Sequence, residues 1–205
     1  SSKAFNDARK NNRIIPFKGP INSKTLSCTD DLIYKLIEND KFGFKNSNSI
    51  YEKKINSMLL GASYAEGICQ ISKNDIAGNL SKKDFLTANF GVSGTSSLVA
   101  LGIMREFGKI IKPKNFIYLY YEGTVLENLD WEKNDNHLIN YINDEYNVNY
   151  LEKYDQIKNF LKLTSAESMS YIYSVKKENH LDKKDTLKIL KENIIDILEL
   201  KKIKY

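Results

Sequence analysis

Apolar and polar positions form alternating blocks along the middle of the chain, and these blocks predict strands that take turns with helices. Three apolar runs predict strands, at residues 55–60, 85–92 and 116–121. The last run shows no polar alternation, so we expect it to be buried on both faces. The intervening segments predict helices, one at 74–81 with Asn74 as its cap and one at 98–111 with a broad apolar face. This order predicts an α/β fold, a three-layer sandwich around a parallel sheet with right-handed crossovers.

The two ends of the chain show different patterns. The first 48 residues are polar and irregular and predict a surface-hugging extension with one short helix at 31–37. After Asn134 the pattern predicts only helices, at residues 135–145, 150–163, 165–177 and 182–203. We therefore expect three parts: an irregular N-terminal extension (1–48), a parallel α/β core (49–133) and a helical C-terminal portion (134–205).

Composition narrows the function classes. Hydrophobic residues make up 41% of the 205 residues and charged residues 28%, which is enough for a packed core. The net charge is +5, but the lysines are spread out beside acidic residues, so we interpret them as a solvated surface and expect no nucleic-acid partner. No apolar run reaches the length of a membrane span, and the compartment stays open between cytoplasm and periplasm.

Metal and nucleotide chemistry have little support in the sequence. Cys28 and Cys69 do not have the spacing of a metal site, and only His137 and His180 could add ligands, so we interpret the cysteines as free thiols. The glycines near Ser63 are not followed by the lysine and hydroxyl residue of a phosphate-binding loop. We expect no cofactor.

Polar residues follow each predicted strand. Ser63 comes after the first, Gly91 to Gly94 after the second, and Glu122 to Thr124 after the third. The carboxyl ends of parallel strands meet at one edge of the sheet, where ligand sites collect. A serine hydroxyl flanked by N–H and hydroxyl donors is the arrangement that ester hydrolysis needs, because the donors stabilise the oxygen that gains charge.

These motifs resemble the SGNH hydrolases, also called GDSL-type. The corresponding motifs are Gly61-Ala62-Ser63, Asn89-Phe90-Gly91-Val92-Ser93-Gly94 and Tyr121-Glu122-Gly123-Thr124-Val125. Two further segments resemble one branch of that family, namely Asp40-Lys41-Phe42-Gly43-Phe44-Lys45-Asn46 and Met104-Arg105-Glu106-Phe107-Gly108 with Lys112-Pro113. The resemblance covers residues 10–163. It implies a flavodoxin-like sheet with Ser63 as the nucleophile and Gly91 and Thr124 as oxyanion donors.

The chain departs from the family pattern at three places. Ala62 replaces the Asp that helps to hold the nucleophile loop, and Thr124 replaces an Asn donor, while the late Asp-x-x-His motif is absent. His180 is the candidate base, although Lys177 stands where the motif has Asp; His137 is a weaker candidate. The chain therefore resembles the front portion of a longer hydrolase.

Each candidate also has a simpler interpretation. Ser63 could cap the backbone of a turn, Gly91 could serve a tight turn, and Thr124 could be an ordinary loop residue. His180 could be a solvated residue near a helix start. We expect Glu66 and Glu122 to be solvated acids, and the three tyrosines 118, 120 and 121 to be strand core rather than a sugar-stacking platform.

Two functions are compatible with the sequence. The first is a serine esterase of the SGNH type that acts on acyl or acetyl esters of a glycan or lipid. The second is a catalytically inactive relative that binds a ligand or partner. Edge strands left open would also lead us to expect a homo-oligomer.

Overall fold

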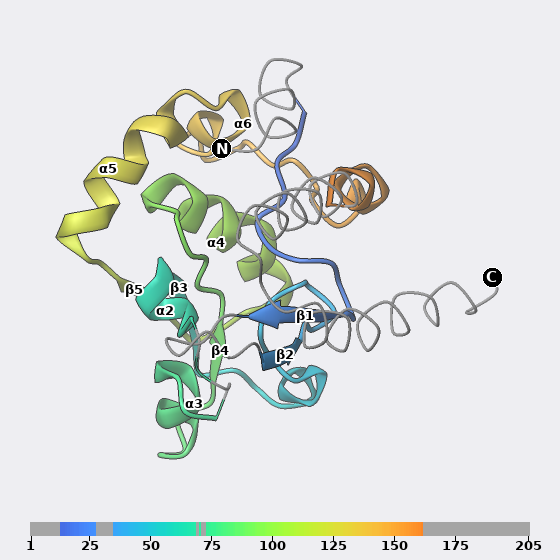
Figure 1. The fold of residues 1–205 in the computed structure, drawn as a ribbon, viewed down its shortest axis with the longest axis vertical. Coiled ribbons are helices and arrows are strands. Elements are labelled where there is room, and N and C mark those ends of the chain that lie inside the picture. Colours follow the sequence, from blue (N-terminus) through green and yellow to red (C-terminus); the bar gives the residue numbers. More distant parts are fainter. Residues whose placement is uncertain (1–12, 28–34, 69, 71–72, 162–205) are drawn as a thin grey trace, which may run out of the picture. The chain divides into compact units, whose positions relative to one another are not determined.

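The computed structural model describes residues 13–27, 35–68, 70 and 73–161 (Figure 1). The chain divides into two units, residues 1–163 and 164–205, and all of the described residues belong to the first. Five predicted features lie outside the described residues: the helices at 165–177 and 182–203, His180, Cys28 and Cys69.

The central element is a three-stranded parallel sheet with the strand order β4-β3-β5. The helices and strands are β1 (Lys24–Ser27), β2 (Lys35–Glu38), η1 (Asn48–Glu52), β3 (Ser57–Gly61), α2 (Ser63–Glu66), α3 (Ile76–Ser81), β4 (Thr87–Asn89), α4 (Ser97–Ile111), β5 (Asn115–Leu119), α5 (Glu122–Lys133) and α6 (Asn136–Asn140). Residues 154–161 are also helical. The three predicted strands, the parallel sheet and the helix at 98–111 are confirmed.

Helices cover both faces of this sheet. Successive side chains of β3 point to opposite faces, so Leu59 packs with Ala65 of α2 and Ala77 of α3. On the other face, Met58 and Leu60 join the larger core cluster that includes the buried face of α4. The predicted α/β class with helices in two outer layers is therefore confirmed at this level.

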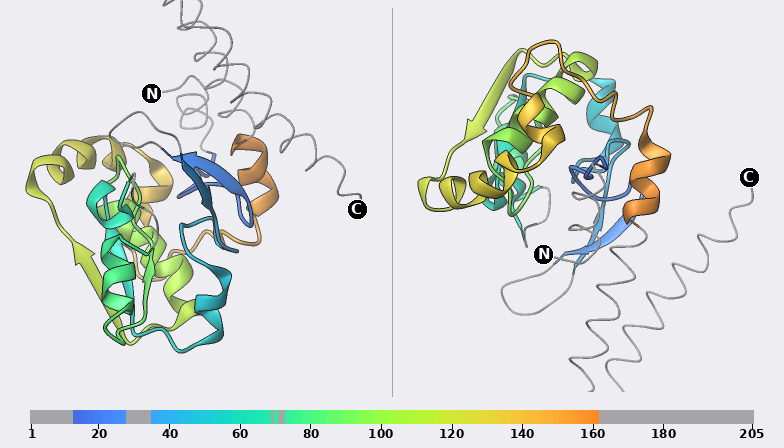
Figure 2. Two further views of the ribbon diagram at one scale, coloured as in Figure 1. Left: turned by 60° about the horizontal axis from the view of Figure 1, so that its bottom comes forward. Right: turned by 90° about the horizontal axis from the view of Figure 1, so that it is seen from above.

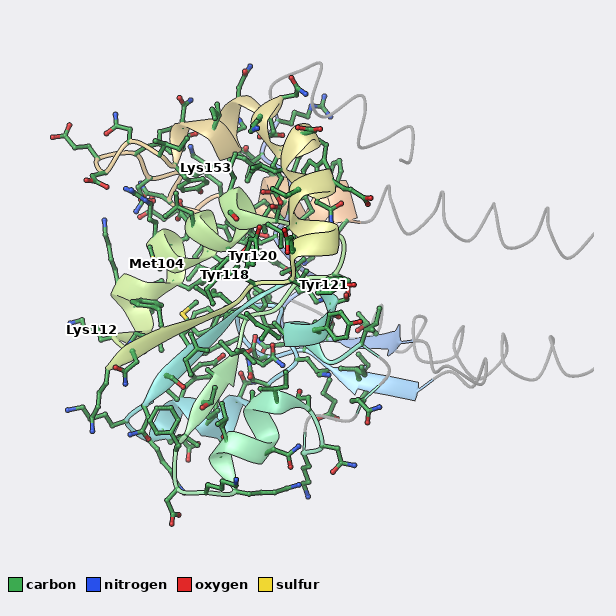
Figure 3. All side chains as sticks on the ribbon, turned by 90° about the vertical axis from the view of Figure 1, so that its left-hand side faces the viewer. Met104, Lys112, Tyr118, Tyr120, Tyr121 and Lys153 are labelled. Atoms are coloured by element: carbon green, nitrogen blue, oxygen red, sulfur yellow. The ribbon has the colours of Figure 1, made fainter. Side chains whose placement is uncertain are left out.

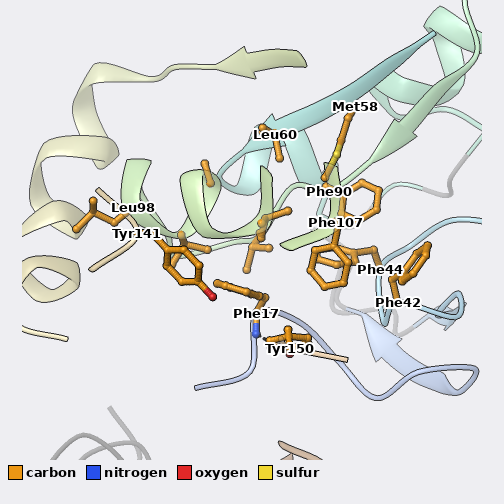
Figure 4. Close-up of a cluster of buried hydrophobic side chains, with 14 of the residues drawn as sticks. Phe17, Phe42, Phe44, Met58, Leu60, Phe90, Leu98, Phe107, Tyr141 and Tyr150 are labelled. Atoms are coloured by element: carbon orange, nitrogen blue, oxygen red, sulfur yellow. Dashed lines mark hydrogen bonds between the residues drawn. The ribbon is translucent and has the colours of Figure 1, made fainter. Parts of the chain in front are cut away.

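An aromatic cluster fills the larger core (Figure 4). Phe44 lies against Phe90, the residue that follows β4, with ring centroids 4.3 Å apart, and Phe17 stacks on Tyr150 at 4.9 Å. The expectation of a surface-hugging extension is wrong for these phenylalanines, because Phe17, Phe42 and Phe44 are all buried. A few large rings in a polar segment bury much area although the segment's mean hydropathy stays low.

The N-terminal segment is also tied to the end of the described chain. The Tyr150 hydroxyl accepts the Phe17 N–H at 2.9 Å, and the Tyr154 hydroxyl accepts the Ile21 N–H at 2.8 Å. The helix at 154–161 thus lies beside the β1–β2 hairpin (Figure 2).

The prediction that residues 116–121 are buried on both faces is wrong. β5 is an outer strand of the sheet, and Phe116 and Tyr118 remain 44% and 38% exposed. Tyr120 and Tyr121 are exposed as well, so the expectation that these tyrosines form strand core is also wrong. An apolar run identifies a strand, but the neighbours that cover it are set by the rest of the fold.

Several helix predictions need correction. Residues 35–37 belong to β2, which pairs antiparallel with β1, rather than to a helix over 31–37. The cap of α3 is Asp75, whose carboxylate accepts the Gly78 N–H at 2.7 Å, rather than Asn74. The helix predicted at 135–145 ends at Asn140, and α5 was not predicted.

Candidate functional site

The three strand ends meet at one edge of the sheet, as predicted. β3 lies in the middle, its last residue Gly61 is paired with Leu119 of β5, and the Gly61 carbonyl accepts the Val92 N–H at 2.8 Å. Ser63 is the first residue of α2, directly after this central strand. The structure therefore brings the segments that carry Ser63, Gly91 and Thr124 to one edge.

Ser63 occupies a short elbow between a buried strand and a four-residue helix. Its side chain is partly buried. The preceding Ala62 is buried and is the N-cap residue of α2, but its side chain offers no oxygen to the free N–H groups of that helix. This turn therefore receives no side-chain acceptor from position 62.

Gly91 has a packing reason to be glycine. A Cβ at this position would lie 2.1 Å from the Glu66 nitrogen and 2.5 Å from the Ala65 carbonyl carbon. The end of β4 therefore touches the backbone of α2 itself. The Gly91 N–H donates to the Asn89 Oδ1 at 2.9 Å, so this donor is already satisfied within the fold.

Thr124 lies in a helix rather than in the predicted loop. It belongs to the first turn of α5, which begins directly after Tyr121. The Tyr121 ring contacts the ring of Tyr64 edge-on, with centroids 5.2 Å apart, and both rings are exposed. This pair joins the residue next to Ser63 to the end of the third strand, so aromatic surface borders the elbow.

Glu66 is not the solvated acid that the sequence predicted, whereas Glu122 is exposed as expected. The Glu66 carboxylate pairs with Lys18 at 2.5 Å and accepts the Ser93 N–H at 2.7 Å. Burial alone would raise the pKa of Glu66, but the charge of Lys18 and the hydrogen bonds from Lys18 and Ser93 outweigh it and lower the pKa. Glu66 therefore holds the loop after β4 against α2 as an anion.

The Glu132 side chain caps the N-terminus of α4. Its fully buried carboxylate accepts the N–H groups of Ser96, Leu98 and Val99, the last two at 2.8 and 3.3 Å. Burial raises the pKa of Glu132 despite these hydrogen bonds. The sequence analysis missed this residue, but Val125, Leu129 and Glu132 share one helix face by their spacing, which is the signal that could have found it.

The histidines do not complete a triad in the part of the chain that the structure describes. His137 lies in α6, and its Nδ1 is 2.8 Å from the Tyr146 hydroxyl. His180 lies outside the described residues.

A buried polar network lies along the outer side of β4. The Asn46 amide donates to the Asn89 carbonyl at 2.9 Å and accepts the Asn89 N–H at 2.8 Å. Asp40 holds this amide at 2.8 Å and also accepts from the Phe42 and Phe44 N–H groups. Burial raises the pKa of Asp40 despite these bonds. Asp40 and Asn46, which hold this network together, both come from the segment 40–46.

Lys45 of the same segment is buried with Asp75, their charged atoms 3.4 Å apart. Its ammonium also donates to the Gly67 carbonyl at 2.8 Å, and burial lowers the pKa of Lys45. A hollow of about 430 Å³ lies here, and its lining includes Lys45, Asp75 and Asn89 but not Ser63.

Some classes of site are absent from the described ranges. No group of three or more His, Cys, Asp or Glu residues there could hold a metal ion. Among the same residues, no helix has the length and apolar character to cross a membrane. No protein-family model, curated protein or solved structure matches the chain.

Proposed function

We propose that the strand-end edge is a serine ester-hydrolase site of the SGNH type, with Ser63 as its nucleophile. The observation that carries this proposal is the position of Ser63 at the first residue of α2, directly after the central strand, with a flanking strand end on each side. The carboxyl ends of parallel strands are where ligand sites collect in α/β sheets.

In this proposal the Ser63 Oγ attacks the carbonyl carbon of an acyl or acetyl ester of a glycan or lipid. The serine proton passes to a base, the alcohol leaves, and water then hydrolyses the acyl-serine to release the acid. Gly91 and Thr124 are the proposed oxyanion donors on either side. Because the Gly91 N–H is bonded to Asn89, we expect turnover to be slow, by a factor on the order of 10²–10³ for one missing donor.

A second function is ligand binding without catalysis. It is favoured by the hydrogen bond from Gly91 to Asn89 and by Ala62, whose side chain gives the turn at Ser63 no acceptor. If Gly91 keeps its bond to Asn89 throughout, the edge would bind an ester or a related ligand without turnover. The exposed rings of Tyr64 and Tyr121 would then be the contact surface.

Labelling of the full chain with a fluorophosphonate probe, followed by peptide mass spectrometry, tests the proposal. We expect one phosphonyl group on Ser63 and none in Ser63→Ala. Ser97→Ala is the matched control, because Ser97 is also the first residue of a helix that follows a parallel strand. The Ser97→Ala chain should still be labelled at Ser63. A folded wild-type chain without label contradicts the esterase and supports the binding function.

A further inference from the structure

The outer side of β5 is an open strand edge in the described part of the chain. The sheet order ends at β5, and the Asn115 N–H donates inward to the Asn56 carbonyl at 3.0 Å. Because backbone groups alternate in direction along a strand, the N–H and C=O groups of Phe116 and Tyr118 point outward. An unpaired edge of this kind is a template for another strand.

Aromatic side chains line this edge. Figure 3 looks onto it, with Lys112 at its start and Tyr118, Tyr120 and Tyr121 toward its end. Phe116 packs on Gly108 of α4, and the Tyr118 hydroxyl lies 3.0 Å from the Ser97 Oγ, yet both rings stay well exposed. The edge therefore offers ordered aromatic surface together with unpaired backbone groups.

We propose that β5 pairs antiparallel with β5 of a second copy of this chain, with the two-fold axis at Ile117. In this register Phe116 faces Tyr118 of the second copy, and both residues point their backbone groups outward, as a hydrogen-bonded pair requires. Cross-strand aromatic pairs of this kind stabilise antiparallel sheets.

The charged residues on either side of β5 favour a second copy of this chain as the partner that binds the open edge. Lys112 ends α4 three residues before β5, and Glu122 begins α5 three residues after it, so the two-fold axis brings the helix end that carries Lys112 toward the helix start that carries Glu122 of the second copy. Both are exposed, and neither takes part in an ion pair within the described residues. The same symmetry places the exposed Lys114 beside the Tyr120 ring, where a cation–π contact can form. The edge is thus complementary to itself.

Charge exchange tests the register. Sedimentation velocity of the full chain over a range of concentrations should show a monomer–dimer equilibrium. Lys112→Glu and Glu122→Lys should each weaken dimerisation about tenfold, because each variant turns two attractive pairs per dimer into repulsive ones. The double variant should return the dissociation constant to within about threefold of the wild type. Lys83→Glu, the same charge change before β4, should leave the dimer unchanged.

A cysteine at the axis gives an independent measurement. In a chain with Cys28→Ser and Cys69→Ser, Ile117→Cys should form an intermolecular disulfide, because facing residues of an antiparallel pair lie about 4.5–5.5 Å apart. Tyr120→Cys is the control, since its two copies would be separated by roughly 20 Å. A monomer at every concentration, a double variant without recovery, or equal cross-linking at both positions would overturn the proposal. A monomer whose Phe116 and Tyr118 amides exchange slowly would also overturn the proposal, because it would show that another segment of the same chain covers β5.

Discussion

The two outer strands of the sheet differ although both come from apolar runs. The residues of β4 are all buried, and the outward N–H and carbonyl of Asn89 are both bonded to the Asn46 side chain. β5 leaves Phe116 and Tyr118 partly exposed and has no such partner in the described residues. A strand's own sequence therefore sets its conformation, whereas a distant polar residue decides whether its edge is sealed.

The Asn46 side chain forms the hydrogen bonds to Asn89 that a neighbouring strand would otherwise form. Its amide presents one donor and one acceptor, as a backbone does, and the carboxylate of Asp40 fixes its orientation. The rest of that carboxylate is satisfied by Phe42, Phe44 and Tyr51. A compact loop thus closes the edge of β4, whereas the edge of β5 has no partner strand among the described residues.

The largest expected effect comes from opening the sealed edge. Asn46→Ala leaves the buried N–H and carbonyl of Asn89 unpaired, so we expect the free energy of unfolding to fall by about 3 kcal/mol. Urea denaturation followed by circular dichroism measures it. Asn48→Ala is the matched control, because Asn48 is exposed, and should cost less than about 1 kcal/mol. Equal losses in the two variants would show that Asn46 does not seal the edge.

A smaller effect is expected at Glu66, which holds the loop after β4. Glu66→Gln should lower the free energy of unfolding by about 1–2 kcal/mol at pH 7, because the ion pair with Lys18 is lost. The folded-state pKa lies below the ordinary value of 4.5, so this contribution is complete above that value and is lost as the pH falls further. Denaturation curves at pH 7 and pH 3.5 check this; a difference between variant and wild type that grows in acid contradicts the assignment.

The smallest effect on folding is expected on the open side. Tyr120 is 53% exposed and its ring lies edge-on to that of Tyr118, with centroids 6.3 Å apart, so Tyr120→Thr should change the free energy of unfolding of the monomer by less than about 0.5 kcal/mol. Denaturation at low protein concentration measures it without the contribution of association. A loss comparable to that of Asn46→Ala would mean that β5 is covered after all.

The sequence predicted the elements that depend on local pattern. The three strands, the helix at 98–111 and the meeting of the strand ends follow from apolar runs, glycines and element order. It did not predict that β5 is an outer strand, because an apolar run does not reveal which segment will cover it. The burial of Phe17 and Phe44 was missed for a related reason, since their partners Tyr150 and Phe90 are far along the chain.

The candidate site was predictable only in its backbone. The position of Ser63 follows from the strand–turn–helix pattern. The bond from Gly91 to Asn89 and the carboxylates of Glu66 and Glu132 depend on side-chain contacts between elements that no local pattern encodes. Ser63 as the nucleophile with Gly91 and Thr124 as donors stays a prediction, which the labelling experiment addresses.

Residue-resolved amide hydrogen exchange is the sharpest test of the contrast between the two edges. The Asn89 amide should be protected at every protein concentration, because its acceptor is the Asn46 side chain of the same molecule. The Phe116 and Tyr118 amides should exchange rapidly in dilute solution and become protected as the concentration rises. Equal protection of Asn89, Phe116 and Tyr118 in dilute solution would contradict an open β5 edge.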